Sequence, residues 1–153
     1  MADIVIKTID GKSTSLSSGA LDALRGGLRG GLSLPGETGY DEARTIWNAM
    51  IDKRPAAVVR AVGASDVIQT VRLAAQHGLL LSVRGGGHNI AGNAVCDGGL
   101  MLDLSRMGSV RVDPQARTAR VEPGARLADL DKETQALVSR HPWGSTRRPG
   151  SPD

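Results

Sequence analysis

The sequence predicts an α+β fold, a small mixed sheet with flanking helices, and three observations lead to this prediction. Short apolar runs at 57–61, 79–83 and 100–102 have the length and the branched residues that are typical of buried strands. A helical apolar pattern stands between the first two of these runs. The later strand patterns follow one another without such a helix, so the regular alternation of a doubly wound sheet is absent.

The elements before residue 62 follow in this order. Residues 4–6 predict a short strand, and residues around 21–28 predict a helix that Gly26-Gly27 interrupts. A loop is expected at Pro35-Gly36, followed by a helix over 41–51. The run at 57–61 is the first strand of the predicted sheet.

The helix after this strand carries recognisable end signals. Ser65 is the expected N-cap, and Asp66 lies in the first turn, where a negative charge suits the helix dipole. Gly78 is the expected C-cap. After the strand at 79–83, further short strands are predicted at 100–102, 110–112 and 118–121. A last helix is marked by Leu127, Leu130 and Ala136.

Composition limits the classes of function. The 153 residues carry a net charge of +3 (19 basic minus 16 acidic side chains), and no basic run alternates with aromatic residues, so a nucleic-acid partner is not expected. No apolar run reaches membrane-spanning length, and the acidic start Met1-Ala2-Asp3 does not resemble a signal peptide. A single cysteine forms no internal disulfide framework. We therefore expect no membrane association and a cytoplasmic location.

The most informative motif is Arg84-Gly85-Gly86-Gly87-His88-Asn89, which follows the strand at 79–83. Three consecutive glycines leave the backbone N–H groups free to approach a flat or anionic group. Arg84 adds a positive charge, and His88 adds a nucleophile. The pattern is typical of a cofactor-binding loop, although spacing alone fits a tight turn at a strand end equally well.

Two common phosphate-binding motifs are excluded by spacing. A dinucleotide fingerprint needs a third glycine where Ile90 stands, and residues 91–99 are too rich in glycine to form its helix. A P-loop needs a lysine after its last glycine, whereas Asn93-Ala94 follows Gly92.

Several motifs in order resemble the FAD-binding domain of the vanillyl-alcohol oxidase type, in its berberine-bridge-enzyme-like subgroup. The resemblance covers residues 32–135 and rests on Arg54–Arg60, Asp66-Val67, Val83–Asn89, Gly92–Gly99, Asp103–Met107 and Val110–Pro114. Upstream, Tyr40–Arg44 and Trp47-Asn48 resemble the lead-in of bacterial members, and Tyr40 and Trp47 are expected to pack that lead-in onto the domain.

The resemblance implies the N-terminal part of a PCMH-type FAD-binding domain, incomplete in this chain. It divides the chain into a lead-in (1–53), the truncated FAD-binding domain (54–135) and a disordered, aberrant tail (136–153). Codons for the tail exist that read TGLATPLGVNSTTGVAG in a shifted frame, which resembles the continuation of the family. We therefore expect a chain frameshifted after about residue 135.

The resemblance also implies the cofactor and its contacts. FAD is expected to be held by Arg84, Gly85, Gly86, Gly87, His88, Asn89 and Gly92, with Arg84 supporting the loop. In the complete protein His88 is expected to be the covalent attachment point of the flavin. The cysteine that attaches flavin in some members lies later in the family order, so Cys96 is expected to be a small buried residue.

These features imply the FAD-binding part of a flavin-dependent oxidoreductase or oxidase that acts on a small organic substrate and passes electrons to dioxygen. The family's catalytic base and substrate pocket lie in a later domain, so no catalytic residue, no metal and no partner chain is assigned. Whether this chain is itself an enzyme stays open. The alternatives are a truncated remnant without stable FAD binding and a nucleotide-binding module that needs a partner chain.

Overall fold

A computed structural model describes residues 2–137 of the chain and contains a four-stranded mixed sheet. Its strands are β3 (Gly31–Ser33), β4 (Ala57–Arg60), β5 (Leu81–Arg84) and β6 (Leu100–Asp103), in the order β3-β4-β6-β5. The strands β4, β6 and β5 run parallel, and β3 is antiparallel to β4. The expected combination of a small mixed sheet with flanking helices is confirmed.

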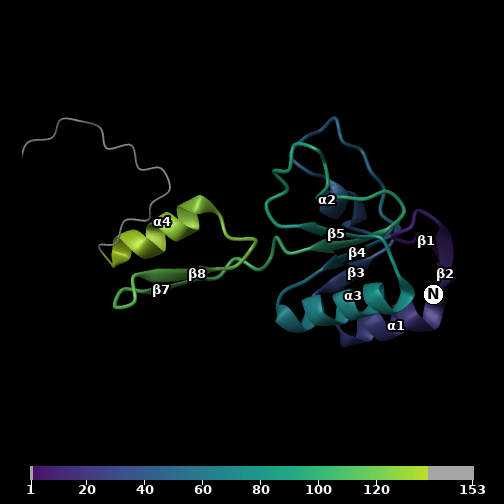
Figure 1. Ribbon diagram of the computed structural model, residues 1–153, viewed down its shortest axis with the longest axis horizontal. Coiled ribbons are helices and arrows are strands. Elements are labelled where there is room, and N and C mark those ends of the chain that lie inside the picture. The colour runs from purple at the N-terminus through teal and green to yellow at the C-terminus, as the bar shows by residue number, and fades with distance from the viewer. Residues whose placement is uncertain (1, 138–153) are drawn as a thin grey trace, which may run out of the picture.

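Helices cover the sheet unequally. Helix α1 (Ser18–Gly27) and helix α3 (Ala64–His77) lie side by side on one face, below the sheet in Figure 1. The opposite face carries the short helix α2 (Tyr40–Arg44) and two long loops. All four residues of β6 are buried, as expected for a strand enclosed by β4, β5 and both covering layers.

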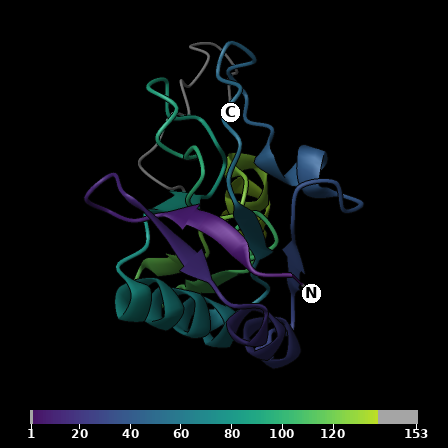
Figure 2. The ribbon, with the colours of Figure 1, turned by 90° about the vertical axis from the view of Figure 1, so that its right-hand side faces the viewer.

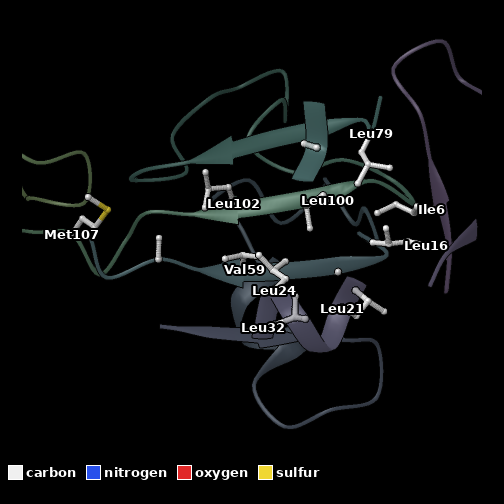
Figure 3. Close-up of a cluster of buried hydrophobic side chains, with 13 residues drawn as sticks. Ile6, Leu16, Leu21, Leu24, Leu32, Val59, Leu79, Leu100, Leu102 and Met107 are labelled. Atoms are coloured by element: carbon white, nitrogen blue, oxygen red, sulfur yellow. The ribbon is translucent and has the colours of Figure 1, made fainter. Parts of the chain in front are cut away.

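The N-terminal hairpin closes one end of the sheet. Its strands β1 (Ile4–Lys7) and β2 (Ser13–Leu16) pair antiparallel and lie in front of the sheet in Figure 2. The Lys7 C=O accepts from Leu80 N–H, and the Lys7 N–H donates to Gly98 C=O, which ties the hairpin to the residues that lead into β5 and β6. Ile6 and Leu16 join the core shown in Figure 3 beside Leu100.

Successive side chains of β4 and β6 point to opposite faces of the sheet and belong to two separate apolar clusters. Val59 and Leu102 belong to the cluster that contains Leu21 and Leu24 of α1. Val58 and Met101 point to the other face and pack against a second cluster formed by Tyr40, Ala43, Ile46, Ala94 and Val95. This second cluster supports the loops that follow β5, where the candidate site lies.

A second body follows the sheet along the chain. It consists of β7 (Val110–Asp113), β8 (Thr118–Val121) and α4 (Leu127–Ala136), and it lies to one side of the sheet in Figure 1. The connection is tight, because Gly124 N–H donates to Met107 C=O at 2.8 Å. A Cβ at Gly124 would lie 2.5 Å from the carbonyl oxygen of Leu104. Only glycine therefore fits at the point where the chain after β8 crosses the segment that follows β6.

The predicted helix over 41–51 is wrong beyond its first turn. Helix α2 ends at Arg44 because outside groups take up its carbonyls: the Thr45 hydroxyl donates to Asp41 C=O, and Arg84 donates to Ala43 C=O. Ser65 is not the N-cap of α3, since Gly63 occupies that position and Ser65 lies in the first turn. Asp66 in the first turn and Gly78 as C-cap are confirmed.

Two strands, β2 and β3, were not expected from the sequence. The other strands and α1, α3 and α4 are present within a few residues of their expected bounds. The expected tail of 136–153 lies, from residue 138 onward, outside the described residues. Within residues 2–137 no helix is both long enough and apolar enough to cross a bilayer.

Candidate cofactor-binding site

The glycine loop, residues 84–89, begins where β5 ends. Arg84 pairs with Asp103 in the parallel ladder, and Arg60 on β4 pairs with the same aspartate, so the loop leaves the carboxyl edge of three parallel strands. Ligands of open α/β sheets characteristically bind at this edge. The glycine motif therefore lies at an edge of the sheet that a ligand can reach.

The fold requires glycine at two of the three positions. A Cβ on Gly85 would lie 2.6 Å from the carbonyl oxygen of Pro123, which follows β8, so that contact requires glycine. Gly87 is buried and has a φ of 72°, the left-handed region that favours glycine. Gly86 is exposed, and a Cβ there would meet only the ring of His88, an exposed side chain that can move. No backbone contact in the described chain explains why residue 86 is glycine.

The loop presents unpaired hydrogen-bond donors. Within the described part of the chain, the backbone N–H groups of residues 86–89 have no protein acceptor. Asn89 shapes the return of the chain, because its C=O accepts from Gly92 N–H and its side-chain Oδ1 accepts from Asn93 N–H, both at 3.0 Å. A row of free N–H groups in a glycine-rich turn is the arrangement that binds phosphate groups.

Arg84 anchors the loop from below. Its Nη1 donates to the carbonyl oxygen of Ala43 at 2.6 Å, and its Nε lies 3.8 Å from Oδ1 of the buried Asp103. Asp103 is held in turn by Ser105, whose N–H and hydroxyl both donate to the carboxylate at 3.0 Å. Within residues 2–137, Arg84 Nε is buried and has no hydrogen-bond partner, and the charge of its guanidinium is balanced by the ion pair with Asp103.

A strap, residues 45–54, follows the glycine loop and its continuation. Ile46 lies under Gly87, and Ile51 packs against Gly92, where a Cβ would come within 2.8 Å of the isoleucine side chain. Lys53 Nζ donates to the carbonyl oxygens of Gly92 at 3.0 Å and Val95 at 3.3 Å. The strap thus forms one wall of the site, which the expected helix over 41–51 did not anticipate.

His88 and Trp47 meet at the open side of the loop. Their ring centroids are 6.4 Å apart with an angle of 48° between the ring planes. His88 is exposed, and Trp47 is 77% exposed, so the expectation that Trp47 packs the lead-in onto the domain is wrong. Tyr40 does pack as expected: it is buried, and its hydroxyl donates to Pro55 C=O at 2.7 Å.

Cys96 is a free, buried cysteine, as expected. Its Sγ accepts a hydrogen bond from the Ser82 hydroxyl at 3.3 Å and lies 3.5 Å from the carbonyl oxygen of Leu100. The thiol therefore has a packing role at the base of the sheet. Within residues 2–137, no cluster of His, Cys, Asp or Glu has the arrangement of a metal site.

The loop fits an anionic group. Within residues 2–137, four unpaired N–H groups suit phosphate oxygens, and the glycine at 86 leaves the face of the loop open. Of the expected contact residues, 84–89 form one loop, and Gly92 lies on its continuation, tied to Asn89 and to Lys53.

Comparisons with known proteins show which proteins this chain resembles. The sequence model of the FAD binding domain family matches residues 55–148. The chain is 38% identical over 120 residues to (R)-6-hydroxynicotine oxidase of Paenarthrobacter nicotinovorans, an alignment that covers 75% of this chain and 26% of that protein.

Two solved structures have a similar fold. BBE-like 1 of Physcomitrella patens superposes with a TM-score of 0.67 at 29% identity, covering 77% of this chain and 25% of that one. The carbohydrate oxidase of Microdochium nivale superposes with a TM-score of 0.70 at 27% identity, covering 83% and 28%. This chain spans about a quarter of the length of these relatives.

Proposed function

Because this chain belongs to the FAD binding domain family, we propose that it is the FAD-binding part of a flavin-dependent oxidase. The enzyme acts on a small organic substrate and passes the electrons to dioxygen. Supporting relatives include proteins named (R)-6-hydroxynicotine oxidase, chitooligosaccharide oxidase and glucooligosaccharide oxidase. Bound FAD supplies the electron-accepting ring, and the protein supplies binding, orientation and electrostatics.

The glycine loop is the proposed seat of the FAD pyrophosphate. The N–H groups of residues 86–89 donate to the phosphate oxygens, and Gly86 lets them approach without a side chain between. Arg84 holds the loop in place through its hydrogen bond to Ala43 C=O and its ion pair with Asp103. Gly92 keeps the continuation of the loop against the strap.

His88 is the proposed covalent attachment point of the flavin in the complete protein. Attachment requires a neutral imidazole nitrogen beside the 8α-methyl group of the ring. The exposed position of His88, directly after the glycines, leaves its imidazole accessible to a ring whose phosphates lie on the loop. Such a bond raises the reduction potential of the flavin, which suits an oxidase.

We also propose a functional division of the chain into a lead-in (1–53), a FAD-binding region (54–135) and a tail (136–153). The family match starts at residue 55, next to the first boundary, and ends at residue 148, inside the proposed tail. The lead-in still contributes Ile6, Leu16 and Leu21 to the main core, so the two parts form one folded body.

The observation that carries the proposal is Gly86, whose lack of a side chain no backbone contact in the described chain explains. We expect FAD to bind the chain in equilibrium dialysis and Gly86→Val to abolish binding, because a branched side chain fills the space of the pyrophosphate. Gly31→Val is the matched control, since a Cβ there meets nothing within 4 Å. Normal FAD binding by Gly86→Val, with its circular dichroism unchanged, would overturn the assignment.

A further inference from the structure

The exposed indole of Trp47 is a feature that the fold does not explain. Large aromatic side chains normally bury most of their surface, yet Trp47 is 77% exposed and its ring lies near that of the exposed His88. The second apolar cluster includes the neighbouring Ile46 and, at its margin, Ile51, but not Trp47. Packing therefore holds the strap on either side of the indole and leaves the indole itself free.

The strap fixes the position of Trp47 relative to the glycine loop. On one side of it, Ile46 lies 3.8 Å from the Cβ position of Gly87. On the other side, the Asn48 side chain donates to Ile90 C=O at 3.5 Å, and Lys53 donates to Gly92 C=O. These contacts hold the backbone of residue 47 beside the glycine loop.

We propose that Trp47 is a cofactor-contact residue, whose indole packs against the isoalloxazine ring of FAD beside His88. The inference rests on the proposed function, because the phosphates of FAD must lie on the glycine loop for its isoalloxazine ring to reach Trp47 and His88. A flat, apolar ring that covers the indole removes its exposed surface from water and gains an aromatic contact. Trp47 then selects a flavin over a nucleotide that carries only the diphosphate.

The test compares FAD with ADP, which has the diphosphate but lacks the flavin. The background chain carries Trp143→Phe, so that Trp47 is its single tryptophan, and each variant is made in this background. Dissociation constants for both ligands are measured by equilibrium dialysis for this background and for Trp47→Ala, Trp47→Phe and Met50→Ala. Met50 is the matched control, because it lies on the same strap and is 91% exposed.

Trp47→Ala is expected to weaken FAD about fivefold, the factor that an aromatic contact of about 1 kcal/mol gives, and to leave ADP unchanged. Trp47→Phe is expected to retain most of the affinity for FAD, and Met50→Ala all of it. The fluorescence of bound FAD is expected to rise in Trp47→Ala, because a stacked indole quenches the flavin.

Three results would overturn the inference. An equal loss for FAD and ADP would mean that Trp47 only supports the loop. No loss for either ligand, or unchanged flavin fluorescence, would mean that the ring lies elsewhere. If the background chain binds neither ligand, the proposed function fails first, and the assignment of Trp47 fails with it.

Discussion

Arg84 donates a hydrogen bond of 2.6 Å to the carbonyl oxygen of Ala43, and this bond joins the end of β5 to the end of α2. The bond has two consequences. It takes up a carbonyl that a longer helix would use, so the chain leaves α2 after Arg44 and forms the strap. It also fixes the first residue of the glycine loop against the strap that encloses it.

Replacement of Arg84 by methionine is expected to loosen this junction. The change removes a hydrogen bond from a charged donor, so the free energy of unfolding should fall by about 1.5–3 kcal/mol. Urea denaturation measures the loss, and FAD affinity should fall with it because the loop is no longer anchored. Lys12→Met is the control, since Lys12 is 82% exposed and its ion pair with Asp10 is expected to contribute less than about 1 kcal/mol. Equal effects of the two changes would contradict the anchoring role.

Asp66 is expected to make stability depend on pH in the acid range. Burial raises the pKa of this carboxyl, but the N–H groups of Val62, Arg29 and Gly30 outweigh burial and hold the pKa below its ordinary value. A lowered folded-state pKa gives stability that is complete above the unfolded pKa of about 3.9 and is lost as the pH falls through the folded value.

Asp66→Asn should therefore lower the free energy of unfolding at pH 7 by about 1–3 kcal/mol and reduce its slope below pH 4. Urea denaturation at several pH values measures both effects. Glu42→Gln, on the exposed side of α2, is the control. An unchanged pH slope in Asp66→Asn would show that other carboxylates cause the acid sensitivity.

His88→Ala is expected to release the flavin from covalent attachment. In the complete protein, purified with its flavin, the unmutated form should retain flavin in the pellet after acid precipitation, whereas His88→Ala should release it to the supernatant. Turnover and reduction potential should both fall in the variant. Complete release of flavin from the unmutated protein would reduce His88 to an ordinary loop contact.

The body formed by β7, β8 and α4 is expected to exchange its amide hydrogens faster than the main sheet. All four residues of β8 are exposed, α4 buries only Thr134, and an isolated two-stranded hairpin is marginal in water. Hydrogen–deuterium exchange read by mass spectrometry separates the two bodies. Equal protection of 110–121 and of β4 and β6 would contradict this expectation.

The sequence predicted the elements whose signals are local. The apolar runs at 57–61 and 100–102 became β4 and β6, because strands buried on both faces need continuous apolar residues. The glycine motif was also predicted to follow a strand, and β5 is that strand, although it lies at the edge of the sheet with Val83 exposed. Strand β3 escaped prediction because Gly31-Leu32-Ser33 has too short a pattern to distinguish it from a loop.

The part of the site that could not be predicted depends on contacts between distant residues. Residues 45–51 have a helical composition. Their path is nevertheless set by contacts with residues more than forty positions away, such as the hydrogen bond from the Asn48 side chain to Ile90 C=O. The exposure of Trp47 follows from that path and not from its own neighbours in sequence. The role of Gly85 likewise depends on Pro123, which reaches the loop only through the crossing at Gly124.

The central claim is that the N–H groups of residues 86–89 receive the FAD pyrophosphate, and amide NMR shifts test it most directly. Adding FAD to the ¹⁵N-labelled chain should move the amide signals of residues 86–89 most, and adding ADP should move the same signals, because both ligands carry the diphosphate. Trp47 indole N–H should move with FAD alone. Shifts centred on another segment, such as β7 and β8, with residues 86–89 unmoved, would contradict the account.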